Sequence, residues 1–142
     1  MADVLDERTI SLEGAQRVLA AALASAKRMN LRVSVAVAGR GGDLKAFARM
    51  DGASMLSGET ARRKVYTVAM TGMSTQEFGS ILKSEMQEEP ELFHGMLGID
   101  RIIAIPGGVP IRFNGQLIGA VAVSGGTSAQ DQEIAEAAAA AK

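Results

Sequence analysis

The side chains with the clearest chemical potential lie in one predicted helix, in the stretch ETARRKVYT. At about 100° per residue, Ala61, Val65 and Val68 fall on one face, which is therefore expected to be buried. Lys64 lies roughly 60° from the centre of that face, in line with Ser57 one heptad earlier, at the margin between core and solvent. A lysine in this position either extends its amine into water or points it into a cleft, where the amine can bind a carboxylate or transfer a proton.

Two further charged residues lie at the end of a predicted strand, in the stretch ARMDGA. Arginine offers a planar fork for a carboxylate and lysine a point charge, so Arg49, Asp51 and Lys64 together would form an anion-recognising site. Asp51 has an alternative role as the cap of the following helix. The neighbouring charges Glu59 and Arg63 are spaced to pair with each other in solvent, which explains them without a site.

His94 is the only histidine and lies in ELFHGMLG, within a segment predicted to be a loop with one short turn. One histidine is enough for a proximal haem ligand, and it is the natural proton carrier near neutral pH. An uncommitted surface histidine is the alternative. A zinc site is not expected, because the chain has no cysteine, no second histidine and no H-x-x-H motif. No other metal site is predicted.

Glycines are concentrated in the stretch IPGGVPIRFNGQLIGAVAVSGG. Neither a Walker-type phosphate loop nor G-x-G-x-x-G fits this stretch. Gly107 and Gly108 are predicted to turn the chain into the next strand, with positive φ at one of them, and Gly125 and Gly126 to end the last strand before a helix. N–H groups at that helix start can hold a carboxylate, so the four glycines either serve the turns alone or also line a ligand pocket.

Composition restricts the classes of function. The 142 residues fit one domain, residues 1–142, with a sizeable core. The net charge of −1 and the four Phe, one Tyr and no Trp argue against nucleic-acid binding. No apolar run approaches the roughly 20 residues that cross a bilayer, so no membrane partner is expected. The acidic start MADVLDERTI does not look like a secretory signal, which predicts a cytoplasmic protein.

Periodicity predicts the order of the elements. Three- and four-residue apolar spacing predicts a helix over about residues 11–29, and the alternating runs RVSVAVA and LKAFARM predict a hairpin. A helix up to Gly72 follows, then one that begins at Ser74 with a capping box to Glu77 and ends near Met86. RIIAI reads as a strand, Asn114-Gly115 as a type I′ hairpin turn, and the alanine-rich end as a helix capped by Thr127 or Ser128.

These elements predict an α+β fold, with a five-stranded antiparallel sheet flanked by helices in the order α-β-β-α-α-β-β-β-α. The strings GGDLKAFARMDGA, ARRK, IPGGVPI, IGAVAVSGG and QDQEIAEAA occur in the order that is found in the GlcG/HbpS family, which includes the haem-binding C-terminal domain of PduO-type proteins. The chain resembles this family over about residues 8–141. One departure is that Ala38 and Gly39 stand where relatives commonly have an acidic residue before the first hairpin glycines.

The resemblance implies binding of haem, a corrinoid-related ligand or a small acid, assembly into a homo-oligomer, and a functional role for Lys64. Two hypotheses therefore stay open. The first is a small-ligand-binding protein, for haem or another tetrapyrrole, with propionates held by Arg or Lys, or for a small carboxylate. The second is a cofactor-independent catabolic enzyme for a small unsaturated or hydroxy carboxylic acid, with Lys64, His94 or Asp51 in proton transfer and Arg49 in binding. A structural or chaperone-like role is a third possibility.

Overall fold

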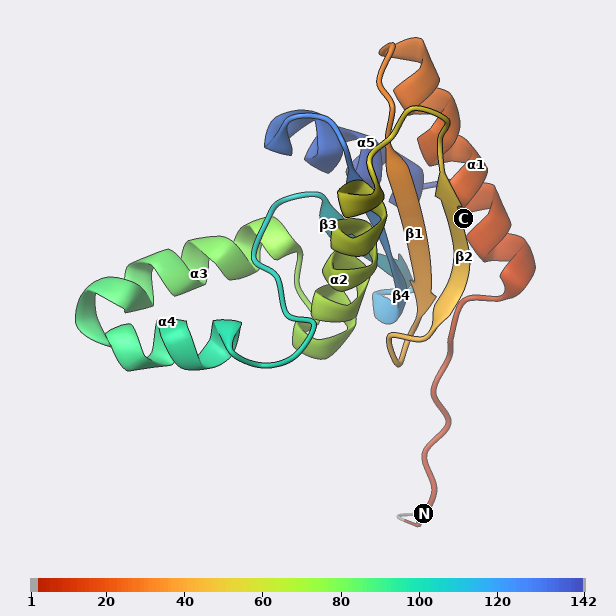
Figure 1. Cartoon of the computed structure of the whole chain (residues 1–142). Helices are drawn as coiled ribbons and strands as arrows, with labels where there is room; N and C mark the ends of the chain where they lie inside the picture. Colours follow the sequence, from red (N-terminus) through yellow and green to blue (C-terminus); the bar gives the residue numbers. More distant parts are fainter. Residues whose placement is uncertain (1–2, 142) are drawn as a thin grey trace.

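The protein is built around a four-stranded antiparallel sheet in the order β2-β1-β4-β3 (Figure 1). The computed structural model describes residues 3–141. The strands are β1 (Ser34–Gly39), β2 (Leu44–Arg49), β3 (Gly108–Phe113) and β4 (Gln116–Ser124). The helices are α1 (Leu12–Arg28), α2 (Met55–Thr71), α3 (Thr75–Glu88), α4 (Pro90–Leu97) and α5 (Ser128–Ala139). The predicted α+β class with an antiparallel sheet is confirmed.

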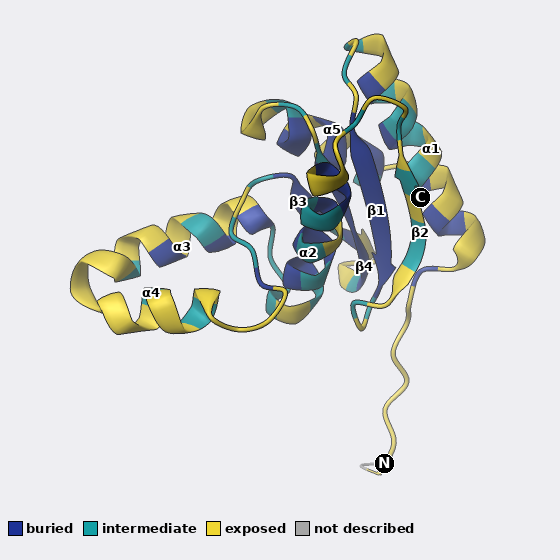
Figure 2. Ribbon diagram, in the orientation of Figure 1, coloured by how far each residue is buried: buried dark blue, intermediate teal, exposed yellow. Residues whose placement is uncertain are grey.

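The central strands β1 and β4 separate two different apolar clusters, and β1 is buried along its whole length (Figure 2). Because side chains alternate along a strand, these two strands present valines to one face of the sheet and alanines to the other. The valine face packs against α1 and α5, in a cluster that includes Val35, Val121 and Ile134. The alanine face, with Ala36 and Ala122, packs against α2. Alanine side chains fill little volume, so α2 lies close to the sheet and its longer side chains reach β4.

The predicted strand at residues 101–105 does not form in the described structure, so the expectation of five strands is wrong. This segment runs beside α2 without sheet pairing, and Ile103 N donates to Thr67 Oγ1 at 3.0 Å. Ile102 packs with Phe78 and Leu82 of α3. The apolar residues of the segment therefore cover helices, and a short apolar run does not by itself distinguish this role from a strand.

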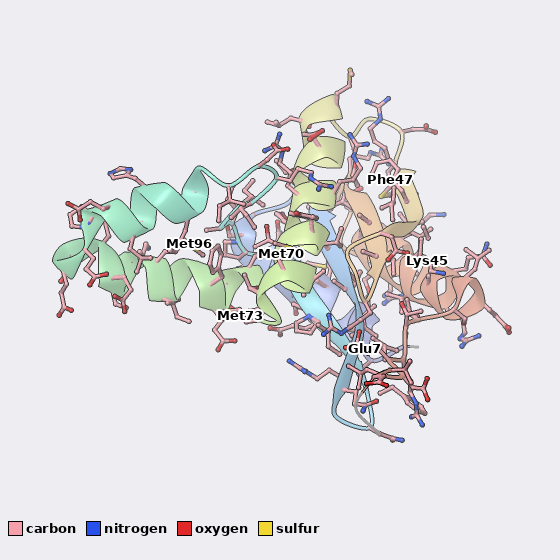
Figure 3. All side chains as sticks on the ribbon, turned by 90° about the horizontal axis from the view of Figure 1, so that it is seen from below. Glu7, Lys45, Phe47, Met70, Met73 and Met96 are labelled. Carbon is pink, nitrogen blue, oxygen red and sulfur yellow. The ribbon has the colours of Figure 1, made fainter. Side chains whose placement is uncertain are left out.

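The segment 87–98, predicted as a loop, contains helix α4, which begins at Pro90 where a missing N–H costs nothing. Helices α3 and α4 form an arm that projects from the sheet (Figure 1), and α4 itself has no fully buried residue (Figure 2). Met73 and Met96 pack against the apolar cluster at the junction of the arm with α2 (Figure 3). Such a short helix needs tertiary contacts for stability, and α3 supplies them. The sequence of this segment alone therefore does not predict the helix.

Three local signals, at one turn and two helix starts, are confirmed. Asn114 and Gly115 have φ values of 50° and 79°, as a type I′ turn requires. Ser74 caps α3 by accepting a hydrogen bond from Glu77 N at 3.0 Å, which is one half of the predicted capping box, and Thr127 caps α5 in a reciprocal capping box. These predictions succeed because the partners are at most three residues apart, so no distant element influences them.

The surface of the arm carries several exposed apolar side chains: Ile81, Met86, Leu92 and Leu97. They support the expectation that copies of the chain associate, which stays a prediction. Within residues 3–141, no helix combines the length and the apolar character that a bilayer crossing demands.

Candidate functional site

Lys64 of α2 is the largest fully buried side chain of the described structure, with 1% of its surface exposed. Its Nζ donates a hydrogen bond to the Val123 carbonyl of β4 at 2.8 Å and lies 3.6 Å from Asp131 Oδ2. The sequence predicted Lys64 at the margin of the core, with its amine either in a cleft or in water. The amine points inward, because α2 lies close enough to the sheet for the four-carbon side chain to reach β4.

The glycine turn before β3 provides the space for this lysine. A Cβ atom on Gly107 would lie 2.7 Å from Lys64 Nζ and 2.6 Å from the Val123 carbonyl oxygen. A Cβ atom on Gly108 would lie 3.0 Å from Lys64 Cβ. Gly107 also has the predicted positive φ, at 124°, so both its backbone and its missing side chain are required here.

Asp131 lies in the first turn of α5 and completes the environment of the lysine. Its Oδ1 accepts a hydrogen bond from Gly126 N at 2.9 Å, and its Oδ2 faces Lys64. A carboxylate near a helix N-terminus is stabilised by the helix dipole, which helps to offset the cost of its burial. The end of β4, the start of α5 and the middle of α2 therefore meet at one buried pair of opposite charges.

Burial acts on the two charges in opposite directions. It lowers the pKa of Lys64, and the nearby Asp131 carboxylate counteracts this effect only in part. It raises the pKa of Asp131, against the hydrogen bond from Gly126 and the charge of Lys64. Both shifts bring the pair closer to transferring the proton from the ammonium to the carboxylate. Such a pair is suited to exchange protons with a bound ligand.

A depression of about 270 Å³ lies directly beside this pair. It is lined by Lys64, Asp131, the glycines Gly125 and Gly126, the apolar Leu56 and Ile105, and five hydroxyl-bearing residues: Ser54, Ser57, Thr60, Ser124 and Ser128. Hydroxyl groups both donate and accept hydrogen bonds, so this lining suits a small ligand rich in oxygen atoms. The volume lies slightly below the roughly 300–1,000 Å³ typical of sites for drug-sized ligands, so it suits a small ligand.

The structure brings some of the predicted site residues together and leaves others apart. Lys64, Ser57, Gly125 and Gly126 line the depression, while Gly107 and Gly108 pack over the lysine from another side. The other three, Arg49, Asp51 and His94, are exposed and do not line it.

The three predicted residues that do not line the depression lie on other parts of the structure. Arg49 lies on the edge strand β2, opposite Ser34 of β1. Asp51 follows β2, and its alternative role as a helix cap is wrong, because Ser54 caps α2 by accepting from Ser57 N at 3.1 Å. His94 lies on α4, where its ring packs edge-on against Phe93 with 5.5 Å between the centroids.

Asp131 is the residue of the site that the sequence did not single out. An acidic side chain in the first turn of a helix has a sufficient local explanation in the helix dipole, so nothing marks it as a partner of Lys64. Thr60 and Ser124, whose hydroxyls hydrogen-bond to each other across the depression, are equally ordinary in the sequence. One signal points to Asp131, namely that it follows the glycine pair after β4 and a buried lysine needs a countercharge nearby.

A second depression, of about 370 Å³, lies between the β1–β2 turn and α2. Its positive side chains already have partners: Arg62 and Arg63 pair with Glu59, and the Arg101 guanidinium lies 3.9 Å from the centre of the Tyr66 ring. The pairing of Glu59 with Arg63 was expected from their spacing. No group of three or more His, Cys, Asp or Glu residues suited to a metal ion occurs among residues 3–141.

Fold and site together define a small α+β protein with a buried lysine at the base of a polar depression. The chain belongs to the HbpS-like family, because the family model described as "Haem degrading protein HbpS-like" matches residues 10–140. It is 34% identical over 115 residues to Protein GlcG of Escherichia coli K12, with 81% of each chain covered. The resemblance to the GlcG/HbpS family is therefore confirmed.

Solved structures agree with this membership. Protein ORFY of Klebsiella pneumoniae superposes with a TM-score of 0.89 at 35% identity, covering 99% of this chain and 95% of the other. A haem complex of PduOC superposes with a TM-score of 0.82 at 26% identity, covering 94% of this chain and 95% of the other. The fold is thus shared with at least one protein that has been crystallised with haem.

Gly107→Ala is predicted to destabilise the protein by about 2 kcal/mol or more. The new methyl group would collide with the Val123 carbonyl and the Lys64 amine, at a φ of 124° that alanine avoids. Urea unfolding measures the change in the free energy of unfolding. Gly41→Ala is the matched control, because its nearest contact is 3.8 Å away, and it should cost less than about 0.5 kcal/mol. Equal costs for both variants would show that the turn does not confine the lysine.

The buried pair also predicts a pH dependence. Because burial holds the pKa of Lys64 below 10.5, the unfolded chain binds more protons than the native protein between the native pKa and that value. The contribution of Lys64 to stability therefore grows as pH rises through this window and is lost as pH falls through the native pKa. The measurement is urea unfolding at intervals from neutral pH to about 10, with Lys64→Met/Asp131→Asn as the baseline in which neither group titrates. If the difference in the free energy of unfolding between the native protein and this double variant stays constant or falls as pH rises, the pKa of Lys64 is not lowered.

Proposed function

We propose that this protein binds a small carboxylate in the depression between α2, the end of β4 and the start of α5. The proposal rests on one observation: the amine of Lys64, 1% exposed, ends beside a polar depression in place of solvent. A buried cation is costly unless it serves a partner, and Asp131 at 3.6 Å satisfies it only loosely. A ligand carboxylate offers the amine a further oxygen partner.

The lining supports this class of ligand. Hydroxyls of Ser54 and Ser128 can donate to carboxylate oxygens, and the first N–H groups of α5 lie at the same edge of the depression. Leu56 and Ile105 add an apolar border against which a short carbon chain can pack. The size of the depression favours acids of a few carbon atoms over a tetrapyrrole.

The alternative of a cofactor-independent enzyme uses the same depression with a changed set of residues. Lys64 keeps its place in this hypothesis, but His94 and Asp51 are replaced by Asp131, since they lie on other surfaces. Asp131 has the position and the pKa shift for proton exchange with Lys64 and with a ligand. Binding is the step that both hypotheses share.

Isothermal titration with acids of two to four carbons is expected to show saturable binding by the native protein. Lys64→Met/Asp131→Asn removes both charges together, which avoids an unpaired buried carboxylate, and binding should weaken by at least about tenfold. The matched control is Lys83→Met, a lysine on the exposed surface of α3, which should bind as the native protein does. Equal affinities in all three proteins would place the ligand elsewhere.

Haem binding is the second candidate, and it is supported by the PduOC haem complex and by the name of the family. The residues around His94 do not enclose a haem, since the imidazole is exposed on α4 and lines none of the depressions described above. A haem held by this histidine would therefore lie outside the Lys64 depression. This separation lets the two candidates be tested independently.

If the second candidate holds, haemin gives a shifted Soret band that is lost in His94→Ala and retained in Lys64→Met/Asp131→Asn. The measurement is an absorbance titration at stoichiometric haemin. An unchanged spectrum with the native protein removes the haem hypothesis, and a shifted band that survives in His94→Ala removes His94 as the ligand.

A further inference from the structure

We propose that Lys64 is a carbonyl-reactive lysine, which forms a Schiff base with a small 2-oxo acid or aldehyde bound in the depression. The inference rests on the proposed function, because it uses the same depression and names the class of compound that reacts there. Its structural basis is the placement of one amine, one carboxyl group and an oxygen-binding lining around the same small space.

The position of the amine is the first argument. Of the lysines that the structure describes, Lys64 alone is buried, while Lys27 and Lys83 are exposed and Lys45 is half-buried. Its Nζ is fixed by the hydrogen bond to the Val123 carbonyl, and the Gly107 turn leaves room for it. An amine held in one place beside a ligand depression reacts with a bound carbonyl as if at a very high local concentration.

The state of protonation is the second argument. Only a neutral amine attacks a carbonyl carbon, and an exposed lysine is almost entirely protonated at neutral pH. Burial lowers the pKa of Lys64 and raises the pKa of Asp131, so both shifts favour a neutral amine next to a protonated carboxyl group. This geometry pairs the nucleophile with its general acid at 3.6 Å.

The reaction balances without any further reactant. The Lys64 nitrogen attacks the carbonyl carbon, a C–N bond forms, and the C=O electron pair moves to oxygen. The protonated Asp131 carboxyl group passes its proton to that oxygen and then, as a carboxylate, takes the proton that the nitrogen loses, which gives a carbinolamine. A second proton from Asp131 lets the hydroxyl leave as water as the C=N bond forms, and the carboxylate recovers this proton from the nitrogen.

The lining explains why the substrate class includes 2-oxo acids. Such an acid carries a carbonyl next to a carboxylate, so the carbonyl can face Lys64 while the carboxylate meets the hydroxyls of Ser54 and Ser128. A simple aldehyde lacks the carboxylate, so its preference for Lys64 over the exposed lysines should be smaller than that of the 2-oxo acid. Comparison of the two probes therefore reports on the polar lining separately from the amine.

The experiment is reductive trapping of the full chain with pyruvate or propanal in the presence of sodium cyanoborohydride, followed by intact mass and peptide mapping. The expected result is one addition per chain, mapped to Lys64 before any other lysine, with a larger preference for Lys64 over the exposed lysines for pyruvate than for propanal. Lys83→Met should be labelled like the native protein. Asp131→Asn should be trapped at least about tenfold more slowly, because the proton relay is lost.

Peptide mapping of the native protein decides the question even if a variant fails to fold. Labels spread over the exposed lysines, with Lys64 unmodified, overturn the inference. Trapping at Lys64 that is equally fast in Asp131→Asn overturns the role of the carboxyl group. Titration with acetate separates the two proposals: binding without trapping leaves the proposed function standing, while the absence of both rejects both.

Discussion

The burial of Lys64 is the constraint on which the arrangement of the site depends. An ammonium group removed from water loses hydration that only a close oxygen partner can replace, and here the partners are the Val123 carbonyl and the Asp131 carboxylate. Removal of one partner from a buried pair typically costs roughly 3–5 kcal/mol. The middle of α2, the end of β4 and the start of α5 are therefore held in one relative position by the same atoms.

Other features follow from the need to admit this lysine. The sheet face below α2 carries alanines, which bring the helix close enough for the side chain to reach β4. The turn before β3 carries Gly107 and Gly108, where any side chain would occupy the space of the lysine. The packing of the lysine thus depends on small residues in the sheet and in the turn before β3.

Membership of the HbpS-like family settles the fold but not the ligand, since one fold supports many functions. A relative crystallised with haem shows what that relative binds. In this chain the only histidine lies on α4, while the polar depression is lined by residues of α2, the end of β4 and the start of α5. A small acid bound in the depression and a haem bound by His94 would therefore occupy separate places on the fold.

The sequence by itself determined the features that depend on near neighbours: the amphipathic helices, the Asn114-Gly115 turn, the caps Ser74 and Thr127, and the α+β class. It also directed attention to Lys64 and to the glycine pairs. Tertiary structure alone decided that residues 101–105 cover helices, that α4 forms against α3, and that Asp131 is the partner of Lys64. These outcomes depend on contacts between residues far apart in the chain, here 67 positions for the ion pair. Periodicity and capping report the energy of a few adjacent residues, and they carry no information about which distant side chain will meet a buried charge.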